Sequence, residues 1–81
     1  MFRLQEASDA ERDGLGVELV DEVGDIVAEV FRSDSQKTVM VSVFSKGVPL
    51  VWMEQLLLAA RGRLACFGDG SPLPESRSEV G

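Results

Sequence analysis

The chain has 81 residues and a formal net charge of −6 at pH 7, from 14 acidic and 8 basic side chains. A chain of this length forms at most one small domain, and such domains commonly owe part of their stability to disulfides, a metal ion or association. The single cysteine, Cys66, excludes an internal disulfide, and the absence of histidine removes the common ligands of zinc and haem, so we predict no metal, no cofactor and stabilisation by association.

The acidic residues are concentrated in the first half of the chain. Residues 6–29 contain nine acids and one base, Arg12. Nucleic-acid binding needs clustered Lys and Arg against the phosphates, so this charge distribution argues against it. The N-terminus lacks the pattern of a secretory signal, and the most apolar window, residues 48–60, is too short to cross a bilayer. We therefore expect a cytoplasmic protein with no membrane partner.

Alternating apolar and polar residues predict three strands before the middle of the chain. They lie at residues 2–5, Val17 to Val23 and Ile26 to Arg32. Gly24 and Asp25 suit a two-residue type II′ turn between the last two, which pairs Leu19 with Val30. The pattern does not fix where the first strand joins the sheet.

The stretch DAERDG, Asp9 to Gly14, places carboxylates at alternate positions before a glycine, as an EF-hand calcium loop does. The twelfth position of such a loop needs a bidentate Glu but is Val20 here. We therefore interpret the stretch as a short helical turn with Ser8 and Glu11 at capping-box spacing. Gly14-Leu15-Gly16 precedes a strand rather than a helix, so we interpret its glycines as turn residues and not as a dinucleotide motif.

The run from Lys37 to Phe44 has the strongest strand composition, and the turn-forming residues Ser33 to Gln36 precede it. A four-residue loop at this turn places three valines on the same sheet face as Leu19 and Val30. These are Val39, Val41 and Val43. A five-residue loop would reverse the faces. We prefer the shorter loop because it gathers the β-branched residues in one core.

One helix is predicted from Pro49 to about Leu64, because the segment is rich in helix formers and proline suits the first helical position. Its sheet-facing stripe consists of Met53, Leu57, Ala60 and Leu64, with Leu50 and Leu56 alongside. Gly62 should weaken the last turns. Cys66 follows among apolar neighbours, and we interpret it as a buried structural thiol.

These elements predict an α+β fold with a three- or four-stranded antiparallel meander and one C-terminal helix packed on one face. Residues 1–67 form the single domain. Residues 68–81 are rich in Gly, Ser, Pro and charge and are expected to form a disordered tail.

The predicted fold carries more apolar surface than one helix can cover. The uncovered set comprises Val20, Val27, Phe31, Met40 and Phe44 on the other sheet face, and Val51 and Leu58 on the outer side of the helix. Contiguous apolar clusters of this kind mark contact surfaces. We predict a non-enzymatic interaction module that forms a symmetric homodimer through the open sheet face, the outer side of the helix or a strand edge.

An alternative hypothesis uses the charge instead. Glu18, Glu22 and Glu29 would form an acidic surface, and the protein would be a small acidic inhibitor or immunity-type protein that binds a basic site on a partner. No catalytic residues are predicted. Histidine and tyrosine are absent, and carboxylates on an open strand face lack the desolvation that tunes a catalytic acid.

Overall fold

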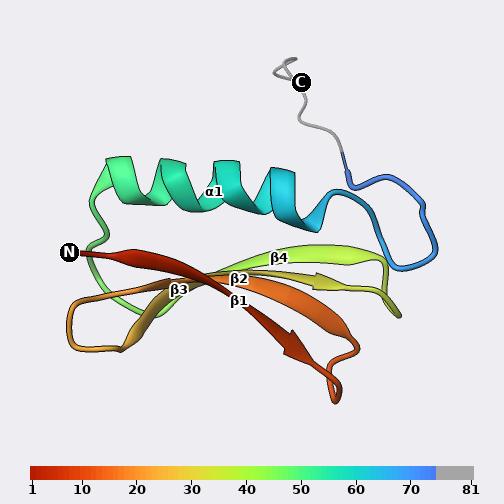
Figure 1. Cartoon of the computed structure of the whole chain (residues 1–81), viewed down its shortest axis with the longest axis horizontal. Coiled ribbons are helices and arrows are strands. Elements are labelled where there is room, and N and C mark those ends of the chain that lie inside the picture. Colours follow the sequence, from red (N-terminus) through yellow and green to blue (C-terminus); the bar gives the residue numbers. More distant parts are fainter. Residues whose placement is uncertain (75–81) are drawn as a thin grey trace.

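The computed structural model describes residues 1–74 and contains one four-stranded antiparallel sheet and one helix. The elements are β1 (Arg3–Asp9), β2 (Gly14–Val20), β3 (Ile26–Ser33), β4 (Thr38–Val43) and α1 (Leu50–Leu64). The strands lie side by side in the order β1-β2-β3-β4, and α1 crosses one face of the sheet (Figure 1). The predicted α+β meander with a C-terminal helix is confirmed, and the first strand lies at the edge beside β2.

The β2–β3 hairpin has a longer turn than predicted. Leu19 pairs with Ala28 and not with Val30, which corrects the predicted register by two residues. The side chain of Asp21 causes the difference, because its Oδ1 accepts hydrogen bonds from the backbone N–H groups of three turn residues at 2.9–3.1 Å. A two-residue shift keeps every side chain on its predicted face.

The β3–β4 hairpin confirms the preferred four-residue loop, which lies one residue later than predicted. Ser33 pairs with Thr38, and Val30 pairs with Val41. Lys37 closes the loop with a φ of 57°. The valines of β4 therefore lie on the helix side of the sheet, as predicted.

Helix α1 begins directly after Pro49, whose carbonyl accepts hydrogen bonds from the N–H groups of Trp52 and Met53 at 3.0 and 3.1 Å. The predicted end of the helix is confirmed, because the helix continues through Gly62 to Leu64. The predicted start is one residue too early, because Pro49 is the N-cap and Leu50 is the first helical residue. The buried core joins one stripe of α1 to the central strands. It contains Val17, Leu19, Ala28, Val30, Leu56, Ala60 and Leu64.

The helix stripe is rotated from the prediction. Leu56 is fully buried, whereas Leu50 is exposed and Leu57 lies at the edge of the core. The rotation follows from where the helix lies, because α1 packs mainly on β2 and less on β3. The rings of Trp52 and Phe2 are 5.7 Å apart at the β1 side. The helix therefore leans toward β1 and away from β4.

Residues 65–74 fold back along the end of the β3–β4 hairpin. The guanidinium of Arg32 donates hydrogen bonds to the carbonyls of Leu64 and Cys66, at 2.8 and 2.6 Å. Asp34 accepts a hydrogen bond from the N–H of Gly68 at 2.9 Å. Residues 68–74 thus make defined contacts, while residues 75–81 of the predicted tail lie outside the described part of the chain.

Cys66 is exposed, which corrects its interpretation as a buried thiol. The backbone turns sharply at Ala65, where φ is 38°, and the neighbours that enter the core are Leu64 and Phe67. The position of Cys66 between two buried residues therefore reflects a turn and not a buried strand.

Candidate interaction surface

On the outer face of the sheet, opposite α1, the chain itself covers the region around Phe31. Phe31 is buried there, although it was predicted to belong to an open patch. A Cβ atom at Gly14 would lie 2.6 Å from the ring of Phe31, and one at Gly16 would lie 3.4 Å from it. The two glycines are therefore strand residues that make room for an aromatic ring, which corrects their interpretation as turn residues.

Arg12 covers the other side of the same ring. Its guanidinium carbon lies 3.9 Å from the ring centroid of Phe31, and its two terminal nitrogens donate to the carboxylate of Glu29 at 3.3 and 3.1 Å. The hydrogen bond with Glu29 raises the pKa of Arg12 above its usual range. Its Nε donates to Asp9 at 2.6 Å, and this bond lowers the pKa of Asp9.

The DAERDG stretch thus forms the β1–β2 turn and anchors this arginine. Asp9 caps the turn by accepting hydrogen bonds from the N–H groups of Glu11 and Arg12, at 3.0 and 3.1 Å. The cap is therefore Asp9 and not the predicted pair of Ser8 and Glu11. Asp13 completes the turn with a φ of 52°.

The predicted acidic surface consists of two buried residues and one exposed residue. Glu18 and Glu29 are buried, and Glu18 accepts a hydrogen bond from the side-chain amide of Gln5 at 2.7 Å. Glu22 alone of the three is strongly exposed, and its carboxylate lies 2.8 Å from the N-terminal amine. Glu18 and Glu29 therefore satisfy contacts within the subunit, a correction to their expected exposure.

The predicted apolar set divides into a buried and an exposed part. Val20, Val27 and Phe31 are buried within the subunit, which corrects their expected exposure. Four members are exposed, with these fractions: Met40 61%, Phe44 63%, Val51 63% and Leu58 70%. The exposed members lie on or next to β4 and on α1.

Three further apolar residues on the helix side of the sheet are exposed although we predicted them to be in the core. They are Val41, Val43 and Leu57. Four strands at about 4.8 Å spacing span roughly 19 Å, whereas a helix with its side chains is about 10–12 Å wide. One helix is therefore too narrow to cover all four strands, and this difference in width follows from the predicted elements alone.

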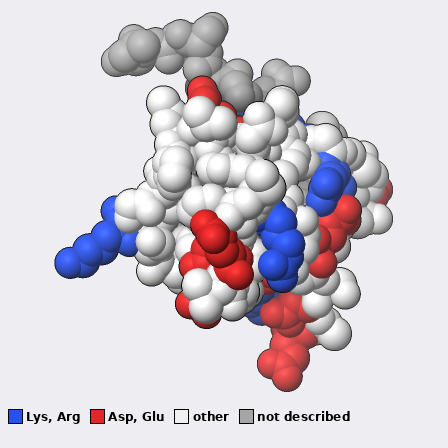
Figure 2. Space-filling model, turned by 60° about the vertical axis from the view of Figure 1, so that its left-hand side comes forward, with Lys and Arg blue, Asp and Glu red and all other residues white. Residues whose placement is uncertain are grey.

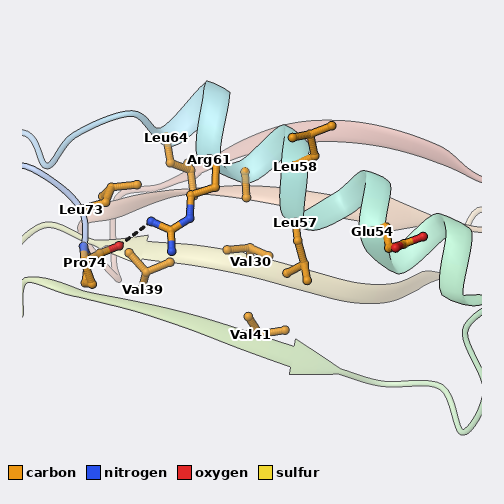
Figure 3. A pocket seen from close by; sticks show the side chains of 11 residues that line it. Val30, Val39, Val41, Glu54, Leu57, Leu58, Arg61, Leu64, Leu73 and Pro74 are labelled. Carbon is orange, nitrogen blue, oxygen red and sulfur yellow. Dashed lines mark hydrogen bonds between the residues drawn. The ribbon is translucent and has the colours of Figure 1, made fainter. Parts of the chain in front are cut away.

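The uncovered strip forms a groove of about 550 Å³ between α1 and β4. Val30, Val39 and Val41 form its floor, and Leu73 and Pro74 close one end (Figure 3). Leu57 points down toward the strands, while Leu58 points away from them. The groove is thus an apolar channel along the side of the helix.

Two charged residues of α1, Glu54 and Arg61, also line this groove. They lie three residues before Leu57 and three residues after Leu58. Arg61 points toward the strands and donates a hydrogen bond to the carbonyl of Pro74 (Figure 3). Within residues 1–74 no group of three His, Cys, Asp or Glu side chains is arranged to hold a metal ion.

Most of the acidic charge lies away from β4. Residues 35–53, which include all of β4 and the start of α1, contain two lysines and no acid. In the end-on view of Figure 2, uncharged side chains cover most of the upper, helix side, and charged side chains gather lower down on the sheet side. A second acidic molecule would meet the least repulsion beside β4.

A scan of protein-family models and searches of curated proteins and of solved structures each gave no match to this chain. Among the described residues, no helix has both the length and the apolar character needed to cross a membrane.

Proposed function

We propose that the protein is a non-enzymatic interaction module that forms a homodimer through the apolar surface on β4 and α1. The observation that carries this proposal is the joint exposure of apolar side chains along β4 and α1. Val41, Leu57 and Leu58 line the groove, Val43 lies on the same sheet face, and Met40 and Phe44 lie on the outer face at the same edge. Scattered exposed apolar residues are ordinary in small proteins, but a contiguous group around a groove is typical of a contact surface.

Two further features support association. The domain is small and has neither a disulfide nor a cluster of metal ligands among its described residues, so its core is its main internal source of stability. The β4 part of the surface also lies within residues 35–53, which contain no acid, so two copies of net charge −6 repel each other least there.

Light scattering over a concentration series tests the proposal. We expect a mass of two chains at tens of micromolar, in the range of ordinary weak dimers. Leu58→Glu should shift the equilibrium toward monomer, because it adds a charge to the apolar surface. Val23→Glu is the matched control, since Val23 is also strongly exposed but lies in the β2–β3 turn. A strict monomer at about 100 μM would contradict the proposal.

The alternative, a small acidic inhibitor that binds a basic partner, receives less support. It relied on Glu18, Glu22 and Glu29, but Glu18 and Glu29 are buried and hydrogen-bonded within the subunit. Salt-sensitive binding to a basic protein that is lost in Glu22→Gln would favour this alternative. Binding that survives the substitution would remove it.

A further inference from the structure

Within residues 1–74 no further strand pairs with the two edge strands of the sheet, β1 and β4. The two edges differ in the residues whose backbone groups point outward. In an antiparallel sheet each residue directs its N–H and C=O to the same side, and the side alternates along the strand. The N–H of Phe44 donates to the carbonyl of Val27 at 2.8 Å, and the N–H of Asp34 donates to the carbonyl of Asp13 at 2.9 Å. These two bonds show which residues of β3 and β4 direct their N–H and C=O groups toward a neighbouring strand.

It follows that the outward groups of β4 belong to Val39, Val41 and Val43. With the observed pairing of all four strands, the outward groups of β1 belong to Leu4, Glu6 and Ser8. An edge strand is normally protected from pairing by charges, proline or a bulge. Among the residues with outward backbone groups, β1 has the charged Glu6 in the middle, whereas β4 has only three valines.

We propose that β4 pairs in antiparallel fashion with β4 of a second copy, with Val41 opposite Val41 and Val39 opposite Val43. This inference rests on the proposed homodimer and names its interface. A two-fold axis through Val41 then makes one continuous eight-stranded sheet, and both helices lie on the same face. All outward N–H and C=O groups of the three valines pair with one another.

This register is the one that pairs the three valines among themselves. A shift of two residues toward either end would place Lys37 or Ser45 opposite a valine. On the outer face the same register sets Met40 against Ser42 and Thr38 against Phe44, with no like charges opposed. The equivalent self-pairing of β1 would oppose Glu6 to Glu6, which is unfavourable.

The α1–β4 groove gains its second wall from the other copy. Pairing lays the valine rows of the two copies side by side and doubles the apolar floor beneath the two helices. The two-fold axis makes the two helices antiparallel. The half of one helix that contains Glu54 therefore faces the half of the other helix that contains Arg61. Both residues line the groove, and their charges are therefore complementary across the axis.

Disulfide trapping tests the register. In a Cys66→Ser background, Val41→Cys should form a disulfide-linked dimer on mild oxidation, because the Cα atoms of an opposed hydrogen-bonded pair are about 5.5 Å apart and a disulfide spans about 4.4–6.8 Å. Ser42→Cys is the matched control. Its two copies would be offset by two residues along the strands, roughly 8 Å apart, and should not link.

A proline scan tests the backbone pairing. Val41→Pro removes an outward N–H that the subunit itself does not use, so the monomer should keep its circular dichroism spectrum while the dimer dissociation constant rises at least about tenfold. Val41→Thr keeps the N–H and should dimerise like the wild type.

The outcomes separate the inference from the proposed function. A wild type that is monomeric by light scattering overturns both. A dimer that survives Val41→Pro, or that links through Leu58→Cys and not through Val41→Cys, overturns the β4 pairing and leaves the homodimer in place. Selective linkage of Val41→Cys, together with loss of the dimer in Val41→Pro, supports the inference.

Discussion

The two faces of the sheet are covered by different means, and each differs from what the residue pattern predicts. Among residues 1–74 no helix covers the outer face, yet its centre is closed because Arg12 and the glycine pair of β2 enclose Phe31, while Met40 and Phe44 at the β4 edge stay exposed. The helix face is expected to be covered, yet it stays open along β4 because α1 leans toward β1. The comparison shows that a single well-placed side chain can close the centre of a face, while a whole helix can leave part of one exposed.

The largest expected effect is a difference in the free energy of unfolding between a substitution in the covered half of the helix face and one in the open half. Leu56 is 0% exposed and its neighbour Leu57 is 43% exposed. Leu56→Ala should lower the free energy of unfolding by about 2–5 kcal/mol, which can unfold a domain of this size, whereas Leu57→Ala should cost less than about 1 kcal/mol. Urea titration measures both, and equal losses would show that the two halves are not distinct.

The second effect tests the outer face. Gly14→Ala places a Cβ against the backbone carbonyl of Arg32 and the ring of Phe31, and overpacking of this kind costs at least about 1–3 kcal/mol, or roughly 5–20 °C in Tm for a domain of this size. Gly62→Ala is the control, because nothing lies within 4 Å of its added Cβ and it should stabilise α1 by about 0.5–1 kcal/mol. A neutral Gly14→Ala in thermal melts would mean that Arg32 and Phe31 of β3 do not approach Gly14 this closely.

The smallest effect concerns the contact between the β3–β4 turn and the segment after α1. The hydrogen bond from the N–H of Gly68 lowers the pKa of Asp34 below its usual 3.8, and Arg32 adds to the shift. The carboxylate therefore stabilises the fold above pH 3.8, and this contribution is lost as the pH falls through the lowered pKa.

Asp34→Asn should accordingly reduce Tm at pH 7, and its difference from the wild type should narrow as the pH falls below about 4. Asp25→Asn removes the same charge from the opposite end of the sheet and serves as the control. A Tm difference for Asp34→Asn that is constant with pH would contradict the assignment.

The architecture could be predicted because it depends on local patterns. The alternating runs, the proline before α1 and the length of the β3–β4 loop indicate the order of the elements and the faces of the sheet. The predicted bounds of the first two strands are wrong, because β1 extends to Asp9 and β2 spans Gly14–Val20 and not Val17 to Val23. The register of the β2–β3 hairpin could not be predicted from turn composition, because the side chain of Asp21 organises a longer turn.

The candidate surface was predicted only in part, because burial depends on contacts between segments distant in sequence. The pairing of Arg12 with Glu29 joins residues 17 positions apart, and no local pattern indicates it. The exposure of Val41 and Val43 depends on the side toward which the helix leans. The width of four strands against one helix is a signal that a strip remains open, but it does not show at which edge.

The most direct test of association through β4 is amide hydrogen exchange at increasing protein concentration. Pairing with a second copy predicts that the N–H groups of Val39, Val41 and Val43 become protected as the dimer forms, while those of Leu4, Glu6 and Ser8 on the other edge stay unchanged. Exchange at the three valines that stays fast at every concentration, or protection that appears at the β1 edge instead, would contradict it.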